Sequence, residues 1–167
     1  MSLVRSILAA AARVTLVAAP LAAQKAPSPF NGTWKLNLAK SKFDPASLTP
    51  KAATTVKYTV TATEVSAVSD GVDSQGRKTH VEYTAKCDGT VAPWHGTIDG
   101  KPNPDQDGIS VKCLDANTLH IVNSLKGKPT TTLHNVVAAD GQTRTVAVNG
   151  TNAQGVKVNN TLAYEKQ

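Results

Sequence analysis

The feature that most constrains the fold is an alternating run over residues 30–43, which contains one of the two tryptophans. Trp34, Leu36 and Leu38 would share one face of a strand, because the residues between them are polar. A period of two is typical of a half-buried β-strand. Gly32 lies just before the first residues of this alternation and permits a sharp bend. We therefore predict that Gly32 and Trp34 have structural roles at the start of the first strand.

The rest of the chain consists of Thr- and Val-rich runs of strand length, separated by turns rich in Gly, Asp and Asn. Beyond the first strand, near 33–38, we predict strands near 54–62, 64–69, 78–87, 90–97, 108–114, 118–125, 129–138, 143–149 and 156–165. No useful helical period appears after residue 24, apart from room for one helical turn at 39–42. Short connections favour antiparallel neighbours in a meander.

An all-β chain of this kind must either close its sheet or stack two sheets. Closure removes exposed strand edges, and a barrel of eight or nine strands encloses its own side chains or one small ligand. We therefore predict a single antiparallel up-and-down β-barrel of eight or nine strands, with a two-sheet β-sandwich as the alternative. The long loop 98–107 is the main irregularity and could fold over one end.

The first 23 residues predict a secretory signal peptide. An apolar stretch from Leu3 to Ala23 is rich in Ala, Leu and Val and carries Arg5 near its start. The alternative is a membrane anchor, but the clean apolar core is shorter than the roughly 20 residues that a spanning helix needs. We expect cleavage after Ala23, a flexible tail at 24–29 and a barrel over 30–167. The mature protein would then be periplasmic or secreted, without a membrane anchor.

The charge pattern argues against a nucleic-acid partner. The chain has 18 basic and 12 acidic residues, and the predicted signal peptide contains two of the basic ones. The lysines recur singly rather than in a stripe, as on a solvated face. Aromatic residues make up only 4% of the chain, too few to stack with bases along a basic groove.

The two cysteines are predicted to face the same interior. Cys87 shares its strand face with Tyr83 and Ala85, and Cys113 shares its face with Val111. Thiols oxidise in an exported protein, so we expect a Cys87–Cys113 disulfide. The alternative is two buried, unpaired thiols. Neither arrangement makes them catalytic, because an apolar setting raises a thiol pKa.

The Gly32-x-Trp34 motif on a first strand resembles the lipocalin signature. The wider opening at 31–43 and the ending at 150–167 are similar to a group of small, secreted, largely uncharacterised bacterial lipocalin-like proteins. This resemblance implies a closed meander barrel with the tryptophan packed across one end. It also implies a basic residue over that tryptophan, and Lys166 occupies the place where Arg is usual.

Catalytic and metal-binding patterns are weak. The histidines are scattered, without the close spacing of a metal-binding segment; they are His80, His95, His120 and His134. No serine lies in a Gly-x-Ser-x-Gly elbow, and no pair of carboxylates forms an obvious acid and base. We therefore predict a non-enzymatic protein without metal or cofactor.

One cluster suggests a ligand. Trp94 and His95 join a large amphipathic ring to a titratable donor beside the long loop, and Tyr83 is expected on a neighbouring wall. Polar groups at the mouth of an apolar barrel are typical of a small-molecule site. The alternative for Trp94 is an ordinary core position. We expect a barrel that binds a small apolar or amphipathic molecule; a filled barrel that acts as an interaction or structural envelope protein, with an unidentified partner, is the alternative.

Overall fold

A computed structural model describes residues 27–167, and the predicted signal peptide lies outside the described residues. The strands are β1 (Gly32–Lys42), β2 (Ala52–Val60), β3 (Glu64–Val72), β4 (Lys78–Lys86), β5 (Asp88–Ile98), β6 (Lys101–Pro102), β7 (Gly108–Cys113), β8 (Thr118–Leu125), β9 (Lys128–Val137), β10 (Thr143–Thr151) and β11 (Lys157–Lys166). A single 3-10 turn, η1 (Ala46–Leu48), follows β1.

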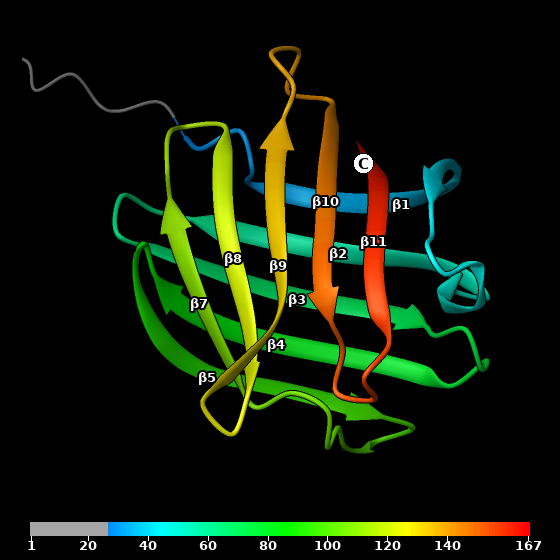
Figure 1. Cartoon of the computed structure of the whole chain (residues 1–167). Helices are drawn as coiled ribbons and strands as arrows, with labels where there is room; N and C mark the ends of the chain where they lie inside the picture. The colour runs from blue at the N-terminus through cyan, green and yellow to red at the C-terminus, as the bar shows by residue number, and fades with distance from the viewer. Residues whose placement is uncertain (1–26) are drawn as a thin grey trace, which may run out of the picture.

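The strands form one closed antiparallel barrel. Every strand pairs with its neighbour in the chain, except that β5 continues to β7, and β1 closes the ring against β11. Ten strands make the barrel, and β6 pairs only with the end of β5. Figure 1 shows β1 to β5 as one layer that β7 to β11 cross steeply. The predicted barrel is therefore confirmed, with more strands than the eight or nine expected.

The helical turn expected at 39–42 does not form, and β1 extends to Lys42. The ladder with β11 shifts between the pairs Asn37↔Ala163 and Lys42↔Thr161, which marks a bulge. Within it, the Lys40 amide donates to Asn37 Oδ1 at 3.1 Å and Ser41 Oγ donates to the Asn37 carbonyl at 2.7 Å. These local bonds replace ladder bonds without making a helix.

The loop after β5 stays beside the sheet. Lys101 and Pro102 form β6 against the end of β5. The Trp94 amide then donates to the Asp107 carbonyl, and the Asp107 amide donates to the Ser124 carbonyl, both at 3.1 Å. The loop therefore links β5 to β8 through backbone hydrogen bonds.

The core fills the barrel from the alternate positions of its strands. Its buried members include Phe30, Trp34, Val56, Tyr58, Val65, Ala67, Ala85, Ile109, Val111, Leu119, Ile121 and Val137. Burying apolar area of this kind is the main favourable term in folding. Only three polar or charged residues are buried in the described part of the chain, namely Ser124, Asn135 and Arg144.

A disulfide joins Cys87, at the end of β4, to Cys113, at the end of β7. Their Cα atoms are 4.9 Å apart, and both residues pack against the core. The predicted pairing is confirmed. A disulfide of this kind indicates a non-reducing, extracytoplasmic environment.

Candidate functional site

One end of the barrel is closed around Trp34. Its side chain is fully buried, and its Nε1 donates to the Phe30 carbonyl at 2.8 Å. Lys166 lies opposite Trp34 in the β1–β11 ladder, with Nζ 5.1 Å from the indole centroid. The same Nζ donates to the Pro29 carbonyl at 3.0 Å. The chain entering β1 is thereby held across this end.

Gly32 makes that closure possible. Its φ is +119°, in a region that side chains rarely adopt, and a Cβ there would come within 3.1 Å of Lys166 Cε. The motif residues Gly32 and Trp34 and the basic residue Lys166 therefore meet at one place, at the closed end.

A second cation, Arg144, lies inside the barrel beside the same tryptophan. Its guanidinium carbon is 4.0 Å from the Tyr164 ring centroid, 4.9 Å from that of Tyr58 and 5.4 Å from that of Trp34. Its Nη1 donates to Asn135 Oδ1 at 2.8 Å and to the Tyr58 hydroxyl at 3.3 Å. Cation–π contacts offset part of the cost of burying this charge.

Arg144 has no carboxylate partner. It is only 2% exposed, yet it takes part in no ion pair among residues 27–167. All 12 acidic residues of the sequence fall in this part of the chain, and none of them is buried. Burying an unpaired charge costs several kcal/mol. The barrel therefore carries an uncompensated positive charge in its interior.

Two donors in this cluster are unsatisfied. Within residues 27–167, Arg144 Nε and Asn135 Nδ2 are buried without a hydrogen-bond partner. The hydrogen bond from Arg144 Nη1 fixes the orientation of the Asn135 amide, because exchanging its oxygen and nitrogen would place two donors against each other. The cluster thus has two buried donors that find no acceptor in the described structure.

A line of side chains crosses four strands next to this cluster. Tyr58 pairs with Ala67, Ala67 with Tyr83, and Tyr83 with Trp94 in successive ladders. All four pack in or against the core. Trp94 lies over Gly96, where a Cβ would collide with the indole ring. The predicted residues Tyr83 and Trp94 are therefore brought together on the inner wall.

His95 does not join them. It follows Trp94 on a strand, so its side chain lies on the outer face, where it is exposed and opposite Glu82. Sequence neighbours on a strand cannot share a face, and the expected Trp94–His95 pair is split by the barrel wall. The interior polar groups come from Arg144 and Asn135 instead.

The interior tyrosines are held neutral. Burial, with the Tyr58 hydroxyl beside it, raises the pKa of Tyr83 well above its usual value, and Arg144 only partly opposes this. Burial also raises the pKa of Tyr164, again against the nearby Arg144 charge. Both phenols therefore remain hydroxyl groups that can donate or accept a hydrogen bond.

Several inward-facing side chains keep accessible surface. Tyr83, Trp94 and Tyr164 are only half-buried, although they lie on the inner wall. The flanking inner positions Ala67 and Ala85 are 3% and 2% exposed, so the sheet backbone itself leaves little surface free. These three rings are therefore less completely buried than the alanines beside them on the inner wall.

Two surface depressions lie elsewhere. A pocket of about 580 Å³ lies at the closed end, between residues 27–30 and the turns after β2 and β7. Buried Phe30 and Leu119 form part of its floor. Its lining contains neither Trp94 nor Arg144.

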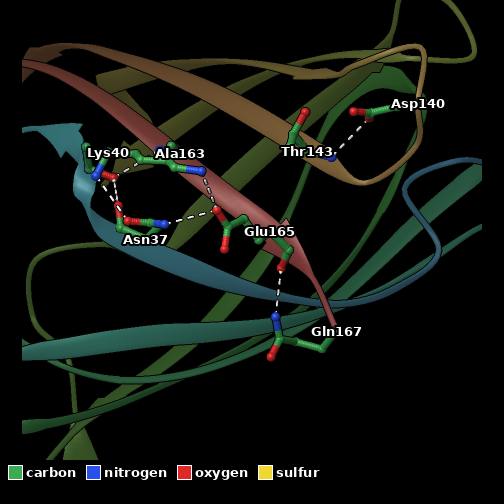
Figure 2. Close-up of polar contacts among 8 residues, drawn as sticks. Asn37, Lys40, Asp140, Thr143, Ala163, Glu165 and Gln167 are labelled. Carbon is green, nitrogen blue, oxygen red and sulfur yellow. Dashed lines mark hydrogen bonds and ion pairs between the residues drawn. The ribbon is translucent and has the colours of Figure 1, made fainter.

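The second depression, about 440 Å³, opens where the β1–β2 ladder ends at Lys35↔Thr55. Figure 2 shows the polar contacts at its edge, with Glu165 beside Asn37 and Lys40. Lys40 Nζ lies 2.9 Å from Glu165 Oε1, and Asn37 Nδ2 donates to the same oxygen at 3.0 Å. These contacts lower the pKa of Glu165, and the contact with Lys40 has the larger effect. The pairs tie the bulge of β1 to β11.

No metal cluster is present in the described residues, where no three His, Cys, Asp or Glu side chains gather. Among residues 27–167, no helix has the length and apolar character needed to cross a bilayer.

His80 is exposed on the outer wall, between Asp70 at 2.7 Å and Glu82 at 3.1 Å. Both carboxylates raise its pKa, Asp70 most.

Sequence reasoning missed Arg144 and Asn135. A usable signal was present, because Arg144 lies two residues before the apolar Val146 and therefore falls on the same face of the strand. An arginine in phase with core residues is unusual, since Arg is rarely buried without a partner.

No protein-family model matches this sequence, and no curated protein matches it significantly. The candidate site therefore stands on its own geometry.

Proposed function

We propose that this protein is an exported, non-enzymatic lipocalin-like barrel that binds a small amphipathic molecule in its interior. The observation that carries the proposal is the accessible surface of Tyr83, Trp94 and Tyr164 on the inner wall of a closed barrel. A site made of aromatic and aliphatic walls with a few polar groups is typical of small-molecule binding.

The walls supply the apolar part of such a site. Leu133 is half-buried and packs against the core from β9, across the interior from the β2–β5 wall. Rings that keep a polar edge, such as those of Tyr83 and Tyr164, suit a molecule that is apolar along its length and polar at one end.

Export is part of the proposal. The disulfide supports an oxidising compartment, and the predicted signal peptide would direct the chain to the periplasm or the medium. A carrier in such a compartment needs neither cofactor nor nucleic acid.

The proposal is tested with the neutral fluorescent probe N-phenyl-1-naphthylamine, which brightens in apolar sites. We expect saturable, one-to-one binding to the native protein. The matched variant Leu133→Trp places a larger ring at an inner position and should weaken binding without unfolding the barrel, whereas Val68→Trp on the exposed outer wall should leave binding unchanged.

The absence of saturable binding would contradict the proposal and favour a filled barrel that acts through its outer face. Denaturing mass spectrometry of the purified protein gives a second readout. A retained amphipathic molecule supports the carrier.

A further inference from the structure

The cluster around Arg144 has a chemical preference that the proposed function does not specify. Its buried members are a guanidinium and an amide joined at 2.8 Å, with the hydroxyl of Tyr58 at 3.3 Å. Arg144 Nε and Asn135 Nδ2 are both unsatisfied donors in the described structure. A group that completes this cluster must accept hydrogen bonds.

The positive charge of Arg144 further restricts which ligand group could complete the cluster. The interior holds one formal positive charge and no buried carboxylate, so a neutral acceptor would leave the charge unpaired. A guanidinium presents its donors in a planar fork that matches a carboxylate. Nη1 is already used by Asn135 and Tyr58, whereas the Nε side of the fork is unused.

Lys166, the other cation beside Trp34, does not compete with Arg144 for a carboxylate. Lys166 Nζ donates to the Pro29 carbonyl at the closed end. It therefore completes the end wall, while Arg144 faces tyrosines on the inside. Trp34 therefore lies beside two cations: Lys166, which has a structural role, and Arg144, which has unused hydrogen-bond donors in the interior.

We propose that Arg144 and Asn135 bind the carboxylate of an amphipathic ligand, of the long-chain carboxylic acid class, whose apolar chain lies along the Tyr83, Trp94 and Leu133 wall. This inference rests on the proposed function, since it names the ligand class of the same interior. The carboxylate accepts from Arg144 Nε and Asn135 Nδ2 and neutralises the buried charge.

The test compares two ligands that differ only in the head group, dodecanoate and dodecan-1-ol, as competitors of N-phenyl-1-naphthylamine. Hydrogen bonds to charged groups predict that the wild type binds dodecanoate about 10-fold to 100-fold more tightly than the alcohol. Arg144→Met should bring this ratio to about one while probe binding persists. Lys57→Met removes the same charge from the exposed outer wall and should keep the wild-type ratio.

Stability supplies a second readout, which also covers the case in which Arg144→Met folds poorly. The double variant Arg144→Met with Asn135→Leu removes the charge and both unsatisfied donors. If the cluster exists for a ligand, the ligand-free double variant should be at least as stable as the ligand-free wild type, because buried polar groups are often replaced by apolar ones without loss. If the cluster instead has a purely structural role, the ligand-free double variant should be clearly less stable than the ligand-free wild type.

The outcomes separate the two proposals. Equal binding of dodecanoate and the alcohol by a wild type that binds the probe overturns the carboxylate site and leaves the carrier function standing. A wild type that binds neither the probe nor either competitor overturns both. Marked destabilisation of the double variant also counts against the ligand role of Arg144.

Discussion

Lys166 and Trp34 face each other across the β1–β11 ladder, with the Lys166 Nζ 5.1 Å from the indole centroid and bonded to the Pro29 carbonyl. The first and last strands are thereby locked at the closed end. The proposed ligand would therefore lie in the rest of the interior.

The two tryptophans should differ in their contribution to stability. Trp34 is fully buried and hydrogen-bonded, so Trp34→Ala should cost about 3–5 kcal/mol in the free energy of unfolding. Trp94 is half-buried, and Trp94→Ala should cost about 1–2 kcal/mol while weakening binding of N-phenyl-1-naphthylamine. Denaturant melts and probe titrations measure both. A larger loss for Trp94→Ala would place that residue in the structural core instead.

Reduction should destabilise the barrel. The Cys87–Cys113 bridge spans 26 residues, and restricting such a loop in the unfolded chain contributes roughly 3 kcal/mol. Thermal melts should therefore show a lower Tm with a reductant. The control is the Cys87→Ser, Cys113→Ser double variant, whose Tm should not respond to the reductant. Two reactive thiols in the unfolded, non-reduced protein would rule out the bridge.

His80 should give stability a pH dependence. The Asp70 and Glu82 carboxylates raise the pKa of folded His80, so the folded state binds the proton more tightly than the unfolded chain does. The contribution is fully present below the unfolded pKa of about 6.5 and is lost as the pH rises through the folded pKa.

The measurement is the difference in Tm between the wild type and His80→Gln across this window. The advantage of the wild type should shrink as the pH rises, and it should shrink less steeply in the Asp70→Asn background. A difference that does not vary with pH would show that the two carboxylates have no effect on folding. The difference in Tm should be small, since the side chains of His80, Asp70 and Glu82 are all exposed.

Gly96→Ala should move Trp94. A methyl group at position 96 would collide with the indole ring, which is the movable partner in that contact. We expect a shift in tryptophan emission in the Trp34→Phe background and weaker probe binding, because the ring has to enter the interior. Gly96→Ala in a Trp94→Ala background has no ring to displace and should be nearly neutral. Unchanged emission in the first variant would contradict this packing.

The alternation of apolar residues was enough to predict the barrel. Leu119 and Ile121 alternate with polar neighbours at the start of the run 118–125, and the strand observed there has the same bounds. The bulge in β1 was missed because it arises where the pairing of residues 37–42 with β11 shifts, and the register of that distant strand is a tertiary property. The outer strand β6 depends on the same kind of contact.

The site was only partly predictable. Tyr83 was expected on the wall and Trp94 near the mouth of the barrel; both lie on the inner wall, while His95 lies outside because strand neighbours alternate. Arg144 and Asn135 escaped notice because polar residues were assumed to face water. Their pairing inside depends on the β9–β10 register, in which Asn135 lies opposite Val146.

The most direct measurement of the central claim is fluorescence quenching by brominated dodecanoate, since bromine quenches only a tryptophan that it touches. In Trp34→Phe, Trp94 is the remaining reporter, and it lies half-buried on the inner wall along which the apolar chain is proposed to lie. We predict saturable quenching by dodecanoate brominated along its apolar chain and much weaker quenching when the bromine is beside the carboxylate. Absence of saturable quenching by either compound would contradict an interior binding site.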